Sequence, residues 1–288
     1  MANKYHVRSN SLPSGSNQSS IRIEEELSKI QTWEATSTST SNSIGSGLSL
    51  LEDLFISLED LLNMASTQKA ISQHQGEKFV EELLDGSVRI LDICGLTRDA
   101  MLQIKEHVQE LHFALRRRKG DSSIETSVAK YNSFIKKMKK NVRKMVTSLK
   151  HMDSKFGASS LLNQDQDLAT VIRVLREVIT VNMSVFQSLL SFLAGSASKS
   201  RKWLLVAKLI HKGVISSEEN FENSNELHSL EAFLSSLVTE GANAEKMQAA
   251  HERMESLENA IESLENGLES IFRHLIKTRV SLLNIMTQ

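Results

Sequence analysis

Proline is almost absent from this chain of 288 residues, and the only one is Pro13. Because proline breaks the interior of an α-helix, the rest of the sequence contains none of the residues that most strongly end helices. Aromatic residues make up only 5%, so leucine, isoleucine, valine and methionine must build the core. These apolar residues recur every three or four positions, which predicts an all-α fold: a multi-helix bundle with long helices.

Cysteine is equally scarce, since Cys94 is the only one in the chain. A single cysteine cannot form an intramolecular disulfide, and no secretory signal peptide opens the sequence. We therefore expect an intracellular protein located in the cytoplasm. Cys94 is predicted to be a small buried hydrophobic residue. The acid-free, serine-rich start also fits a plastid transit peptide, which leaves the plastid as an alternative compartment.

Motifs that carry catalysis are missing. The sequence contains no phosphate-binding glycine loop, no nucleophile elbow and no zinc-protease helix motif. Gly45 and Gly47 flank Ser46, but no strand precedes them. His107 and His112 are five residues apart, which is a poor spacing for a shared metal on one helix. We therefore predict a protein that is not an enzyme and that binds no metal and no cofactor.

A long hydrophobic run is also missing. The most apolar uncharged stretch covers residues 178–194, contains Asn182 and Gln187, and is 17 residues long. A membrane-spanning helix needs about 20 predominantly apolar residues. This stretch is therefore predicted to be a central core helix, with a membrane segment as the alternative.

The first residues carry a short regulatory pattern. Residues 1–20 are rich in serine and asparagine and are predicted to be a disordered tail. Within it, Arg8, Ser9, Ser11 and Pro13 fit the pattern Arg-Ser-x-Ser-x-Pro, which resembles phosphoserine ligands of 14-3-3 proteins. Phosphorylation of Ser11 would add nearly two negative charges and three acceptor oxygens. A 14-3-3 protein is therefore a candidate partner, and an unmodified polar tail is the alternative.

The remaining chain divides into a short N-terminal segment and one large helical domain. Residues 21–46 are predicted to hold a short helix, at 21–33, followed by a linker, because 36–43 is an unbroken run of serine, threonine and asparagine. Residues 47–288 form the predicted bundle domain. Its expected helices cover 48–62, 67–72, 80–118, 124–156, 168–194, 203–210, 227–238 and 247–285. Close packing is expected at Gly86, and a kink or short break at Gly95.

Two stretches resemble a known family. The stretch ELLDGSVRILDICGLTRDAMLQIKEHVQELHFALRRRKGD, at 82–121, and the stretch YHVRSNSLPS, at 5–14, are similar to the plant-specific family of BYPASS-type proteins. The resemblance extends over most of the chain. It implies a role in root and shoot development. We expect the protein to act by binding other proteins through its helical surface, and the sequence does not identify these partners. The family supplies no catalytic residues that could be matched to positions of this sequence.

A formal net charge of −1 conceals two segments of opposite charge: 116–155 is basic and 218–269 is acidic. The predicted helix 124–156 carries its cations around an apolar stripe, at Lys136, Lys137, Lys139, Lys140, Arg143 and Lys144. Such a helix can bind an anionic membrane, although a solvated face of a bundle helix is the simpler interpretation. Nucleic acid is disfavoured as a partner because stacking aromatics are not interleaved with the cations.

The last helix has the most regular repeat, which predicts coiled-coil-like packing. Its seam consists of Met254, Leu257, Ile261, Leu264, Leu268, Ile271 and Leu275. Small residues and Phe272 flank this seam and widen the apolar face. That pattern favours packing onto the protein's own bundle, with a homo-oligomer as the alternative. We further hypothesise that the acidic side of this helix lies beside the basic helix 124–156.

Overall fold

The computed structural model describes residues 15–74, 78–117, 120–156, 166–195, 225–241 and 243–287. Two predicted features lie outside these ranges. They are the candidate phosphosite, formed by Arg8, Ser9, Ser11 and Pro13, and the short helix expected at 203–210. The part of the chain that is described contains most of the predicted bundle.

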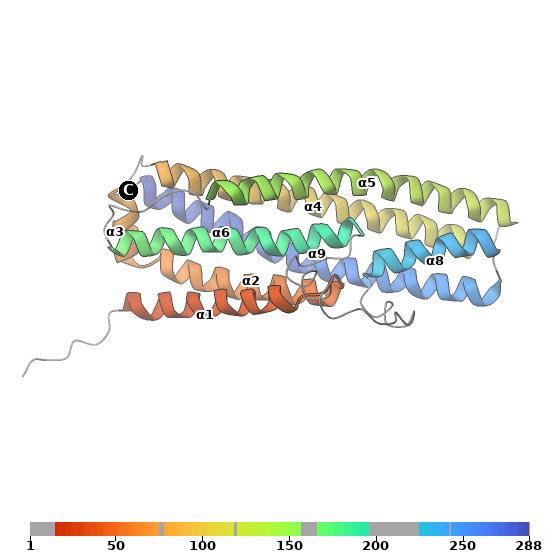
Figure 1. Cartoon of the computed structure of the whole chain (residues 1–288), viewed down its shortest axis with the longest axis horizontal. Coiled ribbons are helices and arrows are strands. Elements are labelled where there is room, and N and C mark those ends of the chain that lie inside the picture. The colour runs from red at the N-terminus through yellow and green to blue at the C-terminus, as the bar shows by residue number, and fades with distance from the viewer. Residues whose placement is uncertain are drawn as a thin grey trace, which may run out of the picture.

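The described residues form helices and no strand, which confirms the predicted all-α bundle. The helices are α1 (Gly15–Thr36), α2 (Ser41–Leu62), α3 (Ala65–Ser72), α4 (Lys78–Arg116), α5 (Gly120–Phe156), α6 (Gln166–Leu193), α8 (Glu226–Glu240) and α9 (Ala244–Thr287). All except the short α3 run close to one common axis, so the molecule is an elongated rod (Figure 1). Helix α4 runs antiparallel to its neighbour α9, because Arg98, Lys105 and His112 pair with Glu269, Glu265 and Glu258 in the reverse order.

The C-terminal helix α9 is the element on which most of the others pack. It contacts α2, α4 and α8 extensively and α3 near the end of the bundle. All seven residues of the predicted coiled-coil seam are buried there, from Met254 to Leu275. The seam therefore packs inside the chain, as the flanking residues favoured, and its surface is not available to bind a second copy of the protein.

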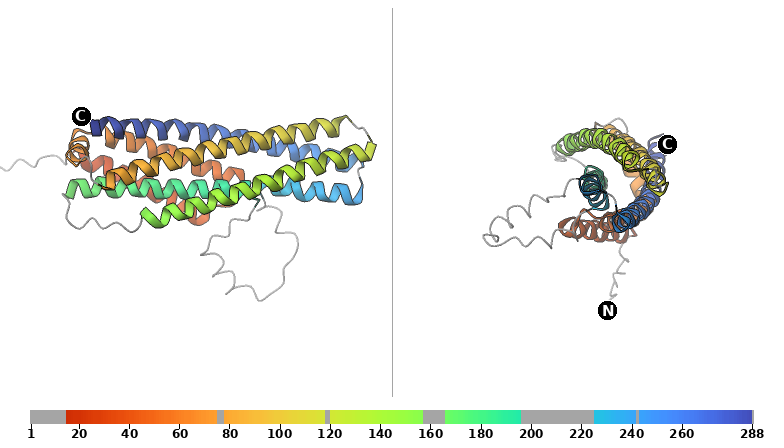
Figure 2. Two further views of the ribbon diagram at one scale, coloured as in Figure 1. Left: turned by 90° about the horizontal axis from the view of Figure 1, so that it is seen from above. Right: turned by 90° about the vertical axis from the view of Figure 1, so that its right-hand side faces the viewer.

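Helices α6 and α8 lie end to end on the other side of the rod and together run along most of its length (Figure 2). Asn225 joins them. Its Nδ2 donates to the carbonyl of Phe192 at 3.0 Å, near the end of α6, and its Oδ1 accepts from the backbone N–H of His228 at 2.7 Å, in the first turn of α8. One buried side chain thus satisfies the orphan backbone groups of two helix ends.

The apolar stretch 178–194 belongs to α6 and lies in the core, where Phe186, Leu190 and Leu193 are buried. This confirms the prediction of a core helix. None of the helices in the described ranges combines the length and the apolar character needed to cross a membrane.

The N-terminal boundaries differ from the prediction. Helix α1 begins at Gly15 and ends at Thr36, so it is longer than the predicted helix 21–33 and includes residues assigned to the tail. The connection to α2 is only 37–40, much shorter than the predicted linker. Thr40 caps α2 by accepting from the N–H of Ser43. Serine and threonine favour linkers and helix caps alike, which explains the error.

Two expectations about helix packing are also wrong. Helix α4 continues without a break through Gly95, and nothing lies within 4 Å of where a Cβ would be at that position. The acidic side of α9 meets α4 and not α5, because α4 lies between them (Figure 2). Arg98 of α4 pairs with Glu269 at 2.7 Å, and Lys105 pairs with Glu265 at 3.3 Å. Gly86, where close packing is expected, is buried.

Gly47 brings α1 and α2 into close contact, and it suggests a test of this packing. A Cβ at Gly47 would lie 2.4 Å from Cζ2 of Trp33, so Gly47→Ala is expected to lower the free energy of unfolding by about 1–3 kcal/mol. Gly45→Ala is the matched control. Nothing lies within 4 Å of that site, so the better helix former should stabilise the protein by up to about 1 kcal/mol. Urea denaturation measures both changes, and a gain from both would contradict the packing of Trp33 on Gly47.

Candidate interaction surface on helix α5

Helix α5 divides sharply into an apolar side and a basic side. The apolar side points toward α4, α6 and α8 and is buried at Val128, Tyr131, Ile135, Met138, Val142 and Leu149. These residues are three, four or seven positions apart, so they lie along one stripe of the helix. The cations occupy positions outside this stripe, and the fold of the bundle therefore directs them to solvent.

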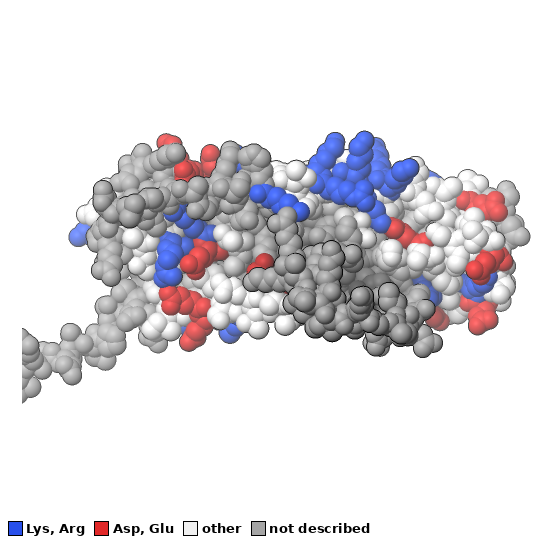
Figure 3. Space-filling model, viewed as in Figure 1, with Lys and Arg blue, Asp and Glu red and all other residues white. Residues whose placement is uncertain are grey.

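Five of the six predicted cations form one exposed group, which we call the α5 basic face: Lys136, Lys137, Lys140, Arg143 and Lys144. Successive members are one to three residues apart, and the face extends for about 12 Å along the helix. No carboxylate of the described residues forms an ion pair with any of the five. Figure 3 shows lysine and arginine side chains concentrated along the edge where α5 runs.

The sixth cation, Lys139, has a different position, which corrects its predicted place in the surface. Its Nζ lies 2.5 Å from Oε2 of Glu231 on α8, and the two side chains are only 15% and 20% exposed. It also passes over Gly195, whose φ of +59° ends α6 in the left-handed region. Lys139 therefore ties α5 to α8 and is not free to bind a partner.

Tyr131 lies on the buried side of α5. Burial, with a smaller contribution from the negative charge of Glu231, raises the pKa of its hydroxyl far above the ordinary value. The side chain is therefore a neutral phenol at every physiological pH.

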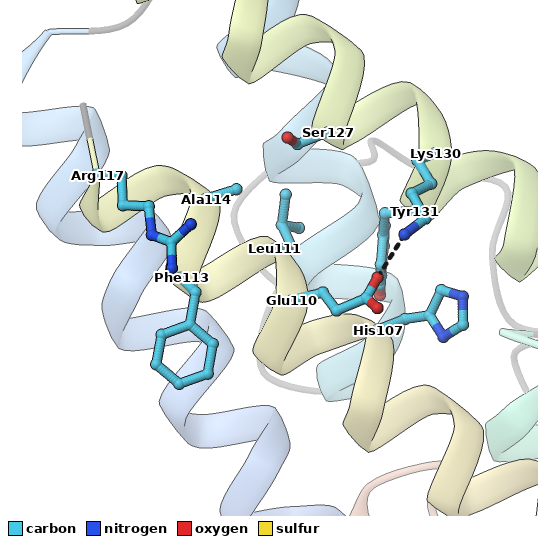
Figure 4. Close-up of a pocket in the computed structure, with 9 residues that line it drawn as sticks. All are labelled: His107, Glu110, Leu111, Phe113, Ala114, Arg117, Ser127, Lys130 and Tyr131. Atoms are coloured by element: carbon cyan, nitrogen blue, oxygen red, sulfur yellow. Dashed lines mark hydrogen bonds and ion pairs between the residues drawn. The ribbon is translucent and has the colours of Figure 1, made fainter. Parts of the chain in front are cut away.

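A cleft of about 330 Å³ lies between α4 and α5 and was not predicted from the sequence. His107, Glu110 and Phe113 of α4 line one side together with Arg117, which directly follows α4. Lys130 and Tyr131 of α5 line the other side (Figure 4). Lys130 donates to Glu110 at 2.7 Å, and that hydrogen bond lowers the pKa of the carboxyl. Phe113 is 60% exposed. These residues lie on or next to two different helices, so the spacing of residues within either helix does not predict that they are close together.

The scattered polar residues do not assemble into a metal site in the described ranges, where no group of three histidine, cysteine or acidic side chains could hold an ion. His107 stacks on Phe134 of α5 with ring centroids 3.7 Å apart, whereas His112 turns to α9 and contacts Glu258 at 3.2 Å. The two histidines that the sequence places five residues apart thus face different neighbours.

Cys94 is buried, as predicted, and its Sγ lies 3.9 Å from the carbonyl of Leu268. Burial raises the pKa of the thiol to about 12, so it stays protonated at neutral pH. A thiol reacts through its thiolate, and Cys94 is therefore inert in the folded protein.

Comparison with known proteins identifies a family for this chain. The family model described as Protein BPS1 matches residues 47–285, which extend from α2 to the last turn of α9. This match confirms the resemblance to BYPASS-type proteins seen in the sequence. No curated protein and no solved structure matches the chain.

The structural role of Lys139 can be separated from the role of the α5 basic face. Lys139→Ala is expected to lower the free energy of unfolding by about 1–3 kcal/mol, because the largely buried carboxylate of Glu231 would lose its cation. Lys140→Ala removes a neighbouring solvent-exposed cation and should change stability by less than about 0.5 kcal/mol. Chemical denaturation of both variants measures the difference. Equal stability of the two would show that Lys139 does not tie α5 to α8.

Proposed function

The chain belongs to the Protein BPS1 family, and from that membership we propose that it is a non-enzymatic regulatory protein of plant root and shoot development. It acts in the cytoplasm by binding other proteins through its helical surface. The family supports the developmental setting, and the α5 basic face supports binding as the mode of action. A second element of the proposal is control of binding by phosphorylation of Ser11.

The α5 basic face is the observation that supports binding as the mode of action. Five exposed cations stand on one helix, and the described residues provide no carboxylate to pair with any of them. Like charges held this close repel one another, and an acidic partner relieves that repulsion on binding. The bundle also holds α5 rigid through its buried stripe, so little side-chain and backbone order has to be created when a partner docks. An acidic segment of a partner protein fits this surface.

Charge reversal tests this surface. In the full chain, Lys136→Glu, Lys137→Glu and Lys140→Glu together are expected to reduce binding of a fluorescent poly-glutamate peptide at least about tenfold. Binding of the unaltered protein should weaken with added salt, because the contact is electrostatic. Fluorescence anisotropy at low and physiological salt measures both effects.

A control variant carries the same change in net charge at scattered exposed positions of other helices: Lys69→Glu, Arg89→Glu and Arg116→Glu. It should retain most of the peptide binding. If both triple variants lose binding equally, the peptide responds to net charge alone, and the proposal of a defined surface fails.

Anionic membrane is a second candidate partner, favoured by the linear arrangement of the cations along one straight helix. Each lysine or arginine near an anionic leaflet contributes about 1 kcal/mol to adsorption. Sedimentation with phosphatidylserine vesicles, using the same two triple variants, distinguishes this candidate. If vesicle binding depends on the α5 basic face and the peptide does not bind, the partner of this surface is a lipid membrane and not a protein.

The tail motif makes the regulatory part of the proposal testable. Full-length protein phosphorylated at Ser11 is expected to bind a 14-3-3 protein, because the phosphate of that protein's ligands sits among arginine side chains. Ser11→Ala should abolish this binding, whereas Ser14→Ala in the same tail should retain it. Fluorescence anisotropy with labelled 14-3-3 protein measures the affinities. Undiminished binding of the Ser11→Ala variant would contradict a switch at Ser11.

A further inference from the structure

A small cavity inside the bundle contains unsatisfied polar groups. It has a volume of about 40 Å³ and lies among apolar side chains of α2, α4, α6 and α9. Three polar side chains also line it: Ser87 of α4, Asn182 of α6 and Thr278 of α9. Polar residues are rare in the core of this protein, so their meeting at one cavity calls for a physical reason.

Asn182 is 1% exposed and only partly satisfied. Its Nδ2 donates to the carbonyl of Val178 at 2.7 Å, one turn earlier in α6. Its Oδ1 is buried and has no hydrogen-bond partner among the described residues. An amide oxygen can accept two hydrogen bonds, so Asn182 brings a free acceptor to the cavity.

Thr278 is 8% exposed, and its Oγ1 is also buried without a partner in the described part of the chain. A helical threonine commonly donates to the carbonyl four residues earlier, as Thr97 does to Ile93 at 2.6 Å. Thr278 makes no such bond, and its hydroxyl is free to donate into the cavity. Two helices thus each contribute to the lining of this cavity one polar residue that has an unsatisfied atom.

Ser87 differs because its hydroxyl is already engaged. It donates to the carbonyl of Leu84 at 2.7 Å and accepts from Nη1 of Arg279 at 2.8 Å. Its oxygen retains one lone pair that can accept a further hydrogen bond. The site therefore offers a donor at Thr278 and acceptors at Asn182 and Ser87.

We propose that this cavity is a buried water-binding site that links α6 to α9. Water is the ligand whose size and chemistry fit, because the volume exceeds what one water needs and is far below that of a metabolite. A bound water accepts from the Thr278 hydroxyl and donates to Oδ1 of Asn182. Its second hydrogen reaches Ser87, which gives the three hydrogen bonds that are typical of a buried water.

The site specifies the register of the helices. The surrounding core is made of leucine, isoleucine and valine, which pack acceptably in more than one register. Shifting α6 by one residue would turn Asn182 by about 100° and bury its amide away from the water. A buried polar contact of this kind penalises misaligned packing more than it adds to stability.

A high-resolution crystal structure of the full chain, with and without xenon pressure, tests the proposal directly. We expect density for water within hydrogen-bond distance of Asn182 Oδ1 and Thr278 Oγ1, and no xenon in the cavity. Empty apolar cavities take up xenon, so xenon at this position or the absence of water density would overturn the proposal.

A double-mutant cycle gives an independent readout in solution. Asn182→Leu and Thr278→Val preserve side-chain volume and remove the polar groups one at a time. Because both groups bind the same water, the double variant should lose less stability than the sum of the two single variants. Strictly additive losses in urea denaturation would contradict a shared water. Where a single variant does not fold, the crystallographic result on the unaltered protein decides.

Discussion

Burial of one apolar stripe, the seam of α9, is the constraint on which the rest of the structure depends. Helix α9 has 44 residues and is about 66 Å long, which makes it the longest helix in the described ranges. Helices α2, α4 and α8 cover it together, and α4 runs along it from His251 to Arg279. The elongated shape of the molecule follows from this requirement.

Polar contacts at the edges of this seam determine which helices lie beside it. Toward α4, Glu269 and Glu265 meet Arg98 and Lys105. Toward α2, Glu59 accepts from His274 at 2.9 Å and from Lys277 at 2.5 Å. Burial of Glu59 raises its pKa, but these two hydrogen bonds outweigh burial and the net shift is downward. Such pairs add little stability at the surface, yet they discriminate between alternative neighbours.

The same arrangement of helices explains why the cations of the α5 basic face have no carboxylate partner among the described residues. Four acids of α9, Glu258, Glu262, Glu265 and Glu269, are engaged by α4. Among the six cations predicted for the surface of α5, Lys139 alone reaches a carboxylate of the described residues. The α5 basic face is therefore a product of topology, since a long acidic helix exists in the chain but lies on the far side of α4. A rigid rod that carries an exposed band of one charge sign fits a protein that works by binding.

Several features followed from the sequence because they depend on neighbouring residues alone. The spacing of apolar side chains predicted the long helices and the buried α9 seam. The stretch 178–194 was predicted to be a core helix because it is too short and too polar to span a membrane. Cys94 was predicted to be buried because a free cysteine behaves as a small hydrophobic residue. Helix ends were less certain, because the serines and threonines near Thr40 suit a linker and a helix cap equally well.

What only the tertiary structure decided concerns residues far apart in the chain. Lys139 and Lys140 look equivalent in sequence, but one meets Glu231 from α8 and the other faces solvent. Asn182 and Thr278 are 96 residues apart and share a cavity. Local periodicity determines which side of a helix is buried, whereas the identity of the neighbour depends on how all the apolar faces are covered together, and that balance is a property of the whole bundle.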